Sequence, residues 1–136
     1  MALYKLIKFE TIKDYDLIQK ENGYLVQDEH NNVAAALSVR NVQFLALLKF
    51  YKGIPKGGHY HKKKRETILA VDGDLECRLI AVDSSKSDRV IVRKNHAVVI
   101  EPGVAHIFYA LNDEVSGIEW SSEVFDKDDI FQYSFG

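Results

Sequence analysis

The sequence has little of what several protein classes require. Its single cysteine, Cys77, fits a reducing compartment. Its purely apolar runs are far shorter than the ~20 residues that a membrane-spanning helix needs. The first residues, MALYKLIKFETIK, carry lysines and a glutamate where a signal peptide would be apolar. These absences predict a cytoplasmic protein without a membrane partner.

An excess of positive charge is also missing. The formal net charge is −2 and the pI is about 6.2, whereas a general nucleic-acid binder is usually basic. No nucleic-acid partner is therefore expected. The positive charge that exists is local, with Lys56 and the run from Lys62 to Arg65 flanking two histidines. Two interpretations stay open for it: a solvated loop, or side chains that hold phosphates at the mouth of a pocket.

The chain is long and apolar enough for one domain over residues 1–136, because 46% of its residues are apolar and 28% are charged. Many short stretches of strand-like sequence are separated by turn signals, which predicts an all-β protein, a sandwich or barrel. The apolar stretch 41–51 could be a helix by composition. We assign it to a strand because Gly53 and Pro55 end it.

Three other segments carry weaker signals. The pair Asp72-Gly73 predicts a tight hairpin with positive φ at both turn residues. Residues 33–37 contain three alanines and leave helix and strand open. The tail, residues 125–136, mixes acidic and aromatic side chains, and is expected to form a short helix or an arm packed against the barrel.

Four polar residues are the strongest candidates for chemistry. His59 and His61 are two residues apart, so along a strand they point to the same face. If Glu66 and His106 also point inward, each precedes apolar residues that face the interior, which places the polar groups at the barrel mouth. Three imidazoles and one carboxylate suit one divalent transition metal, such as Zn, Fe, Mn, Ni or Co. They equally suit general acid–base chemistry, because histidine titrates near neutral pH.

This pattern resembles the cupin family. The first cupin motif is a glycine, five residues, His-x-His, three or four residues, a glutamate, six residues and a glycine. It is matched at every position by the residues Gly53, His59, His61, Glu66 and Gly73. The second cupin motif is matched in part, at Gly103 and His106, while Asn95 replaces its first glycine and Ala110 its last asparagine. The resemblance implies a jelly-roll-like β-barrel, and in metal-binding cupins the matched histidines and glutamate are the ligands.

A narrower resemblance extends over most of the chain. The segments LIKFETI, ENGYLV, GGHYHKKK, EPGVAH and SSEVFDKDDIFQYSF are similar to cupins that act on nucleotide-linked keto-sugars, the TDP-4-keto-6-deoxyhexose 3,4-ketoisomerases and, more distantly, the 3,5-epimerases. Such proteins are typically dimers that exchange N-terminal strands. The resemblance therefore implies a nucleotide-sugar substrate, a homodimer and a role in polysaccharide biosynthesis.

The activity implied is isomerisation or epimerisation by proton transfer next to a carbonyl. His61 or His59 would be the base, and the other histidine, or Tyr60 or Tyr109 across a dimer, would return the proton. Substrate-binding residues are expected at Lys56, Lys62 and Tyr60.

Two alternatives remain. The ketoisomerases usually lack a glutamate at the position of Glu66. Its presence favours a metal-dependent cupin enzyme, such as a dioxygenase or small-sugar isomerase, with His59, His61, Glu66 and His106 as ligands. The incomplete second motif favours a non-catalytic ligand-binding cupin. No organic cofactor is expected in any of the three.

Overall fold

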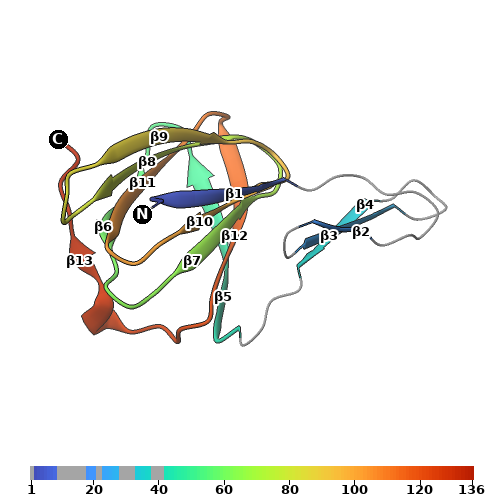
Figure 1. Ribbon diagram of the computed structural model, residues 1–136. Helices are drawn as coiled ribbons and strands as arrows, with labels where there is room; N and C mark the ends of the chain where they lie inside the picture. The colour runs from blue at the N-terminus through green and yellow to red at the C-terminus, as the bar shows by residue number, and fades with distance from the viewer. Residues whose placement is uncertain (1, 9–17, 21–22, 28–32, 38–41) are drawn as a thin grey trace.

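Strands make up most of the described chain, as the sequence predicts (Figure 1). The structure is a computed structural model that describes residues 2–8, 18–20, 23–27, 33–37 and 42–136. The strands are β1 (Tyr4–Lys8), β2 (Ile18–Lys20), β3 (Gly23–Gln27), β4 (Val33–Leu37), β5 (Phe44–Tyr51), β6 (Lys56–Tyr60), β7 (Glu66–Ala70), β8 (Leu75–Ala81), β9 (Ser87–Val92), β10 (His96–Ile100), β11 (Val104–Ala110), β12 (Glu114–Ser121) and β13 (Phe131–Gln132).

Two five-stranded antiparallel sheets form the barrel. One has the order β1-β10-β7-β12-β5 and the other β13-β6-β11-β8-β9. Their facing sides hold the main core, to which Phe50 and Ile68 contribute from the first sheet and Leu79 and Phe108 from the second. Each of these strands alternates buried and more exposed positions for part of its length, because successive side chains point to opposite faces. The architecture is the all-β cupin-type barrel that the motifs imply.

A separate sheet, β2-β3-β4, projects from one end of the barrel in Figure 1. Within the described residues, its strands pair only with one another. Residues 33–37, for which helix and strand were both open, form strand β4.

The segment around Asp72-Gly73 corrects one prediction. These residues do not close a hairpin, because β7 pairs with β10 and β12 while β8 pairs with β11 and β9. The pair instead carries the chain from one sheet to the other, and Gly73 does not have a positive φ. Asp72 accepts a hydrogen bond from the Ser116 amide at 2.6 Å, and a Cβ on Gly73 would lie 2.7 Å from the Asn112 side chain. The turn residues correctly predict a bend, but they do not predict that the strands on either side of it belong to different sheets.

The C-terminal tail contains no α-helix. Residues Lys127–Asp129 form a single 3-10 turn, and β13 then pairs with β6 as the edge strand of its sheet. Asp126 caps the turn by accepting a hydrogen bond from the Asp128 amide at 2.9 Å. The expectation of an arm packed against the barrel is therefore confirmed, and the arm lies against the strand that carries His59.

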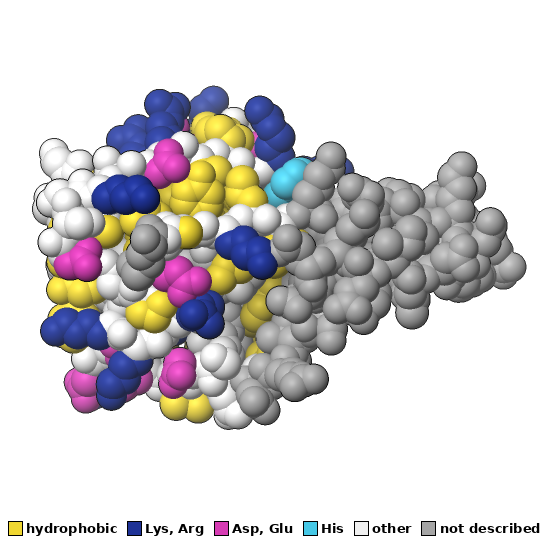
Figure 2. Space-filling model, in the orientation of Figure 1, with side chains coloured by type: hydrophobic (Ala, Val, Ile, Leu, Met, Phe, Trp, Pro, Cys, Tyr) yellow, Lys and Arg dark blue, Asp and Glu magenta, His cyan; other side chains and the backbone are white. Residues whose placement is uncertain are grey.

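Charged side chains of both signs are intermixed on the face of the barrel drawn in Figure 2. Among the described residues, no helix is long and apolar enough to cross a membrane.

Candidate active site

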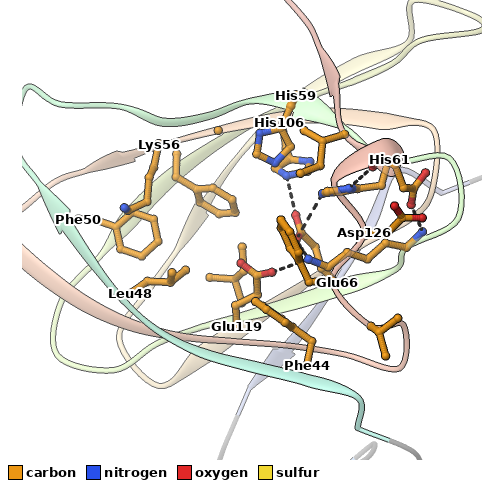
Figure 3. A pocket seen from close by; sticks show the side chains of 18 residues that line it. Phe44, Leu48, Phe50, Lys56, His59, His61, Glu66, His106, Glu119 and Asp126 are labelled. Carbon is orange, nitrogen blue, oxygen red and sulfur yellow. Dashed lines mark hydrogen bonds and ion pairs between the residues drawn. The ribbon is translucent and has the colours of Figure 1, made fainter.

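Strand register brings the four candidate side chains together. His59 lies near the end of β6 and is the direct cross-strand partner of His106 in β11. Opposed residues on paired strands point to the same face, so both rings enter the barrel. His61 follows β6, and Glu66 begins β7 on the facing sheet. Figure 3 shows the three imidazoles and the carboxylate converging in one cavity.

Two backbone features hold the two motif segments in contact. The His61 carbonyl accepts a hydrogen bond from the Gly103 amide at 2.7 Å, which ties the first motif to the second. Gly57 lies against β11, where a Cβ would be 2.7 Å from the His106 carbonyl oxygen. Only glycine permits this close approach of β6 to the strand that carries His106.

The distances suit a single centre. The ligand atoms of His59, His61, Glu66 and His106 all lie within 4.8 Å of one another. His106 Nε2 is 2.5 Å from Glu66 Oε1, and His61 Nε2 is 3.8 Å from Glu66 Oε2. The structure thus brings all four side chains together, while their chemical roles stay predictions.

Hydrogen bonds at the outer ring nitrogens orient two of the histidines. His61 Nδ1 is 2.6 Å from the Asp129 carbonyl oxygen, and His106 Nδ1 is 3.1 Å from the Val104 carbonyl oxygen. Because a carbonyl oxygen only accepts, each Nδ1 carries the proton and donates it. The Nε2 atoms therefore face the cavity. This is the arrangement in which histidines bind metals in proteins.

The centre of the site is a set of buried polar atoms that suits a cation. His61 Nε2 and Glu66 Oε1 are buried and have no aligned hydrogen-bond partner among the described residues. Glu66 Oε1 and His106 Nε2 are so close that a proton on the ring must lie between them. The donor set of three imidazoles and one carboxylate fits a divalent transition metal.

Burial and neighbouring charges shift the pKa values of the three histidines in different directions. Burial, with the charge of His106, lowers the pKa of His59 to about 4, and burial also lowers the pKa of His61. Burial opposes the charge of His106 as well, but the attraction of Glu66 and their hydrogen bond outweigh it and raise its pKa. For Glu66, burial is outweighed by His106 and Lys64, which hold the pKa of this carboxyl well below its usual range. Near neutral pH, without a metal, the site therefore holds a neutral His59 beside a His106–Glu66 ion pair.

A second charged pair lies in the same cavity. Lys64 Nζ is 2.7 Å from Glu119 Oε2 and 3.5 Å from Glu66 Oε2. Phe44, Leu48 and Phe50 line the apolar side of the cavity (Figure 3). Its volume is about 210 Å³. This is less than the ~300–1,000 Å³ of pockets that enclose a whole drug-sized ligand, so a larger ligand must extend out of the mouth.

The structure separates the remaining candidates. Lys56 lines the cavity, with its Nζ 6.0 Å from the centre of the Phe50 ring. Tyr60 and Lys62 do not line it. Tyr60 stacks on Phe131 at 5.3 Å between ring centres, and Lys62 Nζ lies 4.3 Å from the centre of the same ring. Tyr60 therefore lies on the outer face of its sheet, and Lys62, in the bend after β6, lies against the same Phe131 ring.

Tyr109 also faces away from the cavity. The Arg78 guanidinium lies over its ring at 4.8 Å from the centre. Tyr109 or Tyr60 could act in catalysis only by reaching the cavity of a second chain.

Glu119 and Asp129 were missed in the sequence, and Lys64 was considered only as part of the basic run. Strand parity places Glu119 on the same face of β12 as the buried Val115 and Gly117, but it does not show that Glu119 pairs with Lys64. Asp129 carried no such signal, because the tail has no regular period. Its role follows only from contacts between segments more than sixty residues apart.

Comparison with known proteins points to one family. The family described as "Polysaccharide biosynthesis C-terminal domain" matches residues 27–133. No curated protein sequence matches the chain.

Solved structures with the same fold include enzymes that act on sugar nucleotides. The QdtA 3,4-ketoisomerase from Thermoanaerobacterium thermosaccharolyticum, solved as a double mutant in complex with TDP, has a TM-score of 0.74 at 17% identity, covering 96% of this chain and 88% of that chain. The dTDP-6-deoxy-D-glucose-3,5-epimerase RmlC from Legionella pneumophila, in complex with dTDP-4-keto-L-rhamnose, has a TM-score of 0.68 at 13% identity, with 97% and 78% covered.

The capsular polysaccharide assembling protein CapF from Staphylococcus aureus has a TM-score of 0.64 at 23% identity. The match covers 87% of this chain but only 34% of CapF. At these identities the likeness establishes the fold, an RmlC-like cupin barrel.

Proposed function

The chain belongs to the polysaccharide biosynthesis C-terminal domain family, and we propose that it isomerises or epimerises a nucleotide-linked 4-keto-6-deoxy sugar. The observation that carries the proposal is the cross-strand pairing of His59 with His106 in one cavity, where burial lowers the pKa of His59 and Glu66 raises the pKa of His106. Proton transfer next to a carbonyl needs both a base and an acid, and environments that move two pKa values apart assign the two roles. Structural relatives that act on such sugars support the substrate class.

His59 is the proposed base. It is half-buried, whereas His61 and His106 are 6% and 2% exposed, so it is the most accessible of the three imidazoles. It takes the proton from the carbon next to the carbonyl, and His106 gives a proton to the carbonyl oxygen, which forms an enediol. For an isomer, His59 returns the proton to the neighbouring enediol carbon, while the hydroxyl on the first carbon gives its proton to His106 and becomes the new carbonyl. For an epimer, a donor on the opposite face protonates the first carbon, while the original carbonyl oxygen gives its proton back to His106.

Lys56 is the proposed contact for the diphosphate. The cavity has room for part of a nucleotide sugar only, and Lys56 is exposed at its rim. Lys64 is unsuited to this part, because Glu119 and Glu66 already neutralise it. An exposed ammonium near the mouth would hold phosphate as a point charge.

Deuterium exchange tests this function. With TDP-4-keto-6-deoxyglucose in deuterium oxide, the wild-type protein is expected to place deuterium at a sugar carbon next to the carbonyl. His59→Asn should slow the exchange by ~10²–10⁴-fold, the usual contribution of a general base. Because the pKa of His59 is about 4, protonation of this base should not slow exchange between pH 7 and about pH 5. Mass spectrometry and proton NMR measure both effects.

The matched control is His96→Asn, which removes an imidazole outside the cavity and should leave exchange unchanged. Binding of the sugar nucleotide without any exchange would contradict the proposal and favour the non-catalytic ligand-binding cupin.

A metal-dependent cupin enzyme is the second candidate. It is favoured by the His61 Nε2 atom, which is buried without a hydrogen-bond partner among the described residues, and by the full donor set. One divalent transition metal would be bound by His59, His61, Glu66 and His106, and when bound it would supply Lewis-acid polarisation of a substrate oxygen. In that case Lys56 remains an exposed charged group that lines the cavity outside the donor set.

We also propose that the chain forms a homodimer through the outer face of β5. Leu45 and Leu47 on this edge strand are 64% and 81% exposed, and Ile118 on β12, the cross-strand partner of Leu47, is only partly buried. Exposed apolar surface of this extent along a sheet edge favours pairing with another chain.

Light scattering tests the dimer. The wild-type protein should have twice the 15.5 kDa mass of the chain, and Leu47→Glu should shift it to the monomer mass, because a charge would be buried in the interface. Leu111→Glu, at an exposed leucine beyond the end of β11, is the control and should stay dimeric. A monomeric wild-type protein would exclude this interface.

A further inference from the structure

We infer that Asp129 is a positioning residue that sets the tautomer and direction of the His61 ring. The inference rests on two separate contacts of one residue. The side chain of Asp129 binds the loop after His61, and its backbone carbonyl binds His61 itself.

The side chain contact is a carboxylate held by consecutive amides. The amides of Lys62, Lys63 and Lys64 donate to the two carboxylate oxygens of Asp129 at 2.9–3.2 Å. Asp129 is buried, with 7% of its surface exposed. Burial opposes its charge, but the three amide hydrogen bonds outweigh this and lower its pKa. An anion is required here, because each of the three amides would otherwise lack an acceptor as the chain turns from β6 into β7.

The carbonyl contact acts directly on the ring. His61 Nδ1 donates to the Asp129 carbonyl oxygen at 2.6 Å, so the proton stays on Nδ1 and the lone pair of Nε2 faces Glu66. A free histidine favours the opposite tautomer only weakly, so one short hydrogen bond decides which nitrogen carries the proton. Without this acceptor, Nε2 could hold the proton and donate it to Glu66, 3.8 Å away.

Neighbouring contacts hold the Asp129 carbonyl in place. The Asp129 amide donates to the Asp126 carbonyl at 3.0 Å within the 3-10 turn. After the turn, β13 pairs with β6, and the Tyr133 amide donates to the Gly58 carbonyl at 2.9 Å. The carboxylate anchors one end of this segment and the strand pairing anchors the other. The carbonyl of Asp129 lies between the two anchors and has little freedom to leave His61.

The consequence concerns the metal-dependent candidate. There His61 must present an unprotonated Nε2 to bind the metal, so the inference rests on that proposed function for its purpose but not for its test. Replacing a group that accepts the hydrogen bond of a metal-binding histidine typically lowers metal affinity or activity by about 10–100-fold.

The experiment compares Asp129→Asn with Asp128→Asn. Both remove one negative charge from the same turn, but Asp128 is exposed, whereas in Asp129→Asn an amide NH₂ replaces one acceptor oxygen and faces backbone N–H groups. Long-range proton–nitrogen NMR of ¹⁵N-labelled protein reports the tautomer of each imidazole. We expect His61 as the Nδ1–H tautomer in wild type and Asp128→Asn, and a mixture of tautomers in Asp129→Asn. Titration with Zn²⁺ alone should show affinity about 10–100-fold weaker for Asp129→Asn than for Asp128→Asn.

Three outcomes would overturn the inference. The first is a His61 ring with Nε2–H in the wild-type protein, which needs no variant and is decisive even if Asp129→Asn does not fold. The second is an unchanged His61 tautomer in Asp129→Asn, which would reduce Asp129 to a support of the fold. The third is equal zinc affinity of the two variants. If the proposed function fails instead, the wild-type protein will show no deuterium exchange while the tautomer difference between the variants persists.

Discussion

Glu66→Gln is expected to cause the largest loss of activity of any single substitution that keeps side-chain size. Glu66 is 2% exposed and is the counter-charge of both His106 and Lys64. Glutamine preserves the shape but removes the charge, and an unpaired buried cation costs several kcal/mol. His106 will therefore lose its proton, and with it the acid that protonates the carbonyl oxygen. Deuterium exchange should fall by ~10²–10⁴-fold.

The pH profile gives the sign of this effect. Glu66 raises the pKa of His106, so in wild type the charged acid persists to higher pH and activity declines as pH rises through that pKa. Without Glu66 the same decline should begin at lower pH. Glu114→Gln is the matched control, because Glu114 is half-exposed and pairs only with Lys49 at the surface. A wild-type pH profile in Glu66→Gln would show that His106 is not the acid.

The same variant decides the metal alternative. If the protein is a metal cupin, elemental analysis of tag-free wild-type protein should find about one equivalent of a transition metal, and Glu66→Gln should lose most of it. Wild-type protein with less than about a tenth of an equivalent, and no activation by added metal, would remove this alternative.

Gly57→Ala is expected to reduce exchange activity and stability more than any other substitution of a residue without a polar side chain. A Cβ at residue 57 would lie 2.7 Å from the His106 carbonyl oxygen and 3.1 Å from Ile107 Cα, both of them backbone atoms that cannot rotate away. Its φ of 111° also lies outside the left-handed region that other residues tolerate. Strand β6 must then move away from β11, which separates His59 from its cross-strand partner His106. Loss of exchange activity should accompany a loss of about 1–3 kcal/mol in the free energy of unfolding.

Gly53→Ala separates the two causes. Gly53 has a φ of 83°, but a Cβ there would meet nothing within 4 Å. This variant carries the backbone strain without the clash, and its stability cost should be about 1–2 kcal/mol with activity retained. Urea unfolding and the exchange assay measure both variants. Equal losses of activity would show that the contact between Gly57 and β11 does not position the site.

Much of the site could be predicted before the fold was known. The spacing of His59 and His61 requires them to share a face, and the inward sets that begin at Glu66 and His106 are buried as parity predicts. Asn95 has a φ of 66°, in keeping with its place at a motif glycine. Each of these inferences needs only the geometry of a single strand or turn.

The wrong predictions instead concern how segments pair and which face a side chain occupies in the folded barrel. Asp72-Gly73 has the residues of a hairpin turn, yet its flanking strands belong to different sheets. Tyr60 and Tyr109 lie next to site residues in the chain, but alternation turns them to the outer face. Lys62 also follows a site residue, and it lies against the Phe131 ring instead of in the cavity.

Three features are written in residue spacing, because alternation and turn preference act over a few residues: which residues are strand, which faces are apolar and which four polar side chains are candidates for chemistry. The selection of Lys64, Glu119 and Asp129 as their neighbours is not. It arises when β7, β12 and the C-terminal turn close around β6, and the hydrogen bonds and charge pairs that result exist only between segments that the folded barrel brings together.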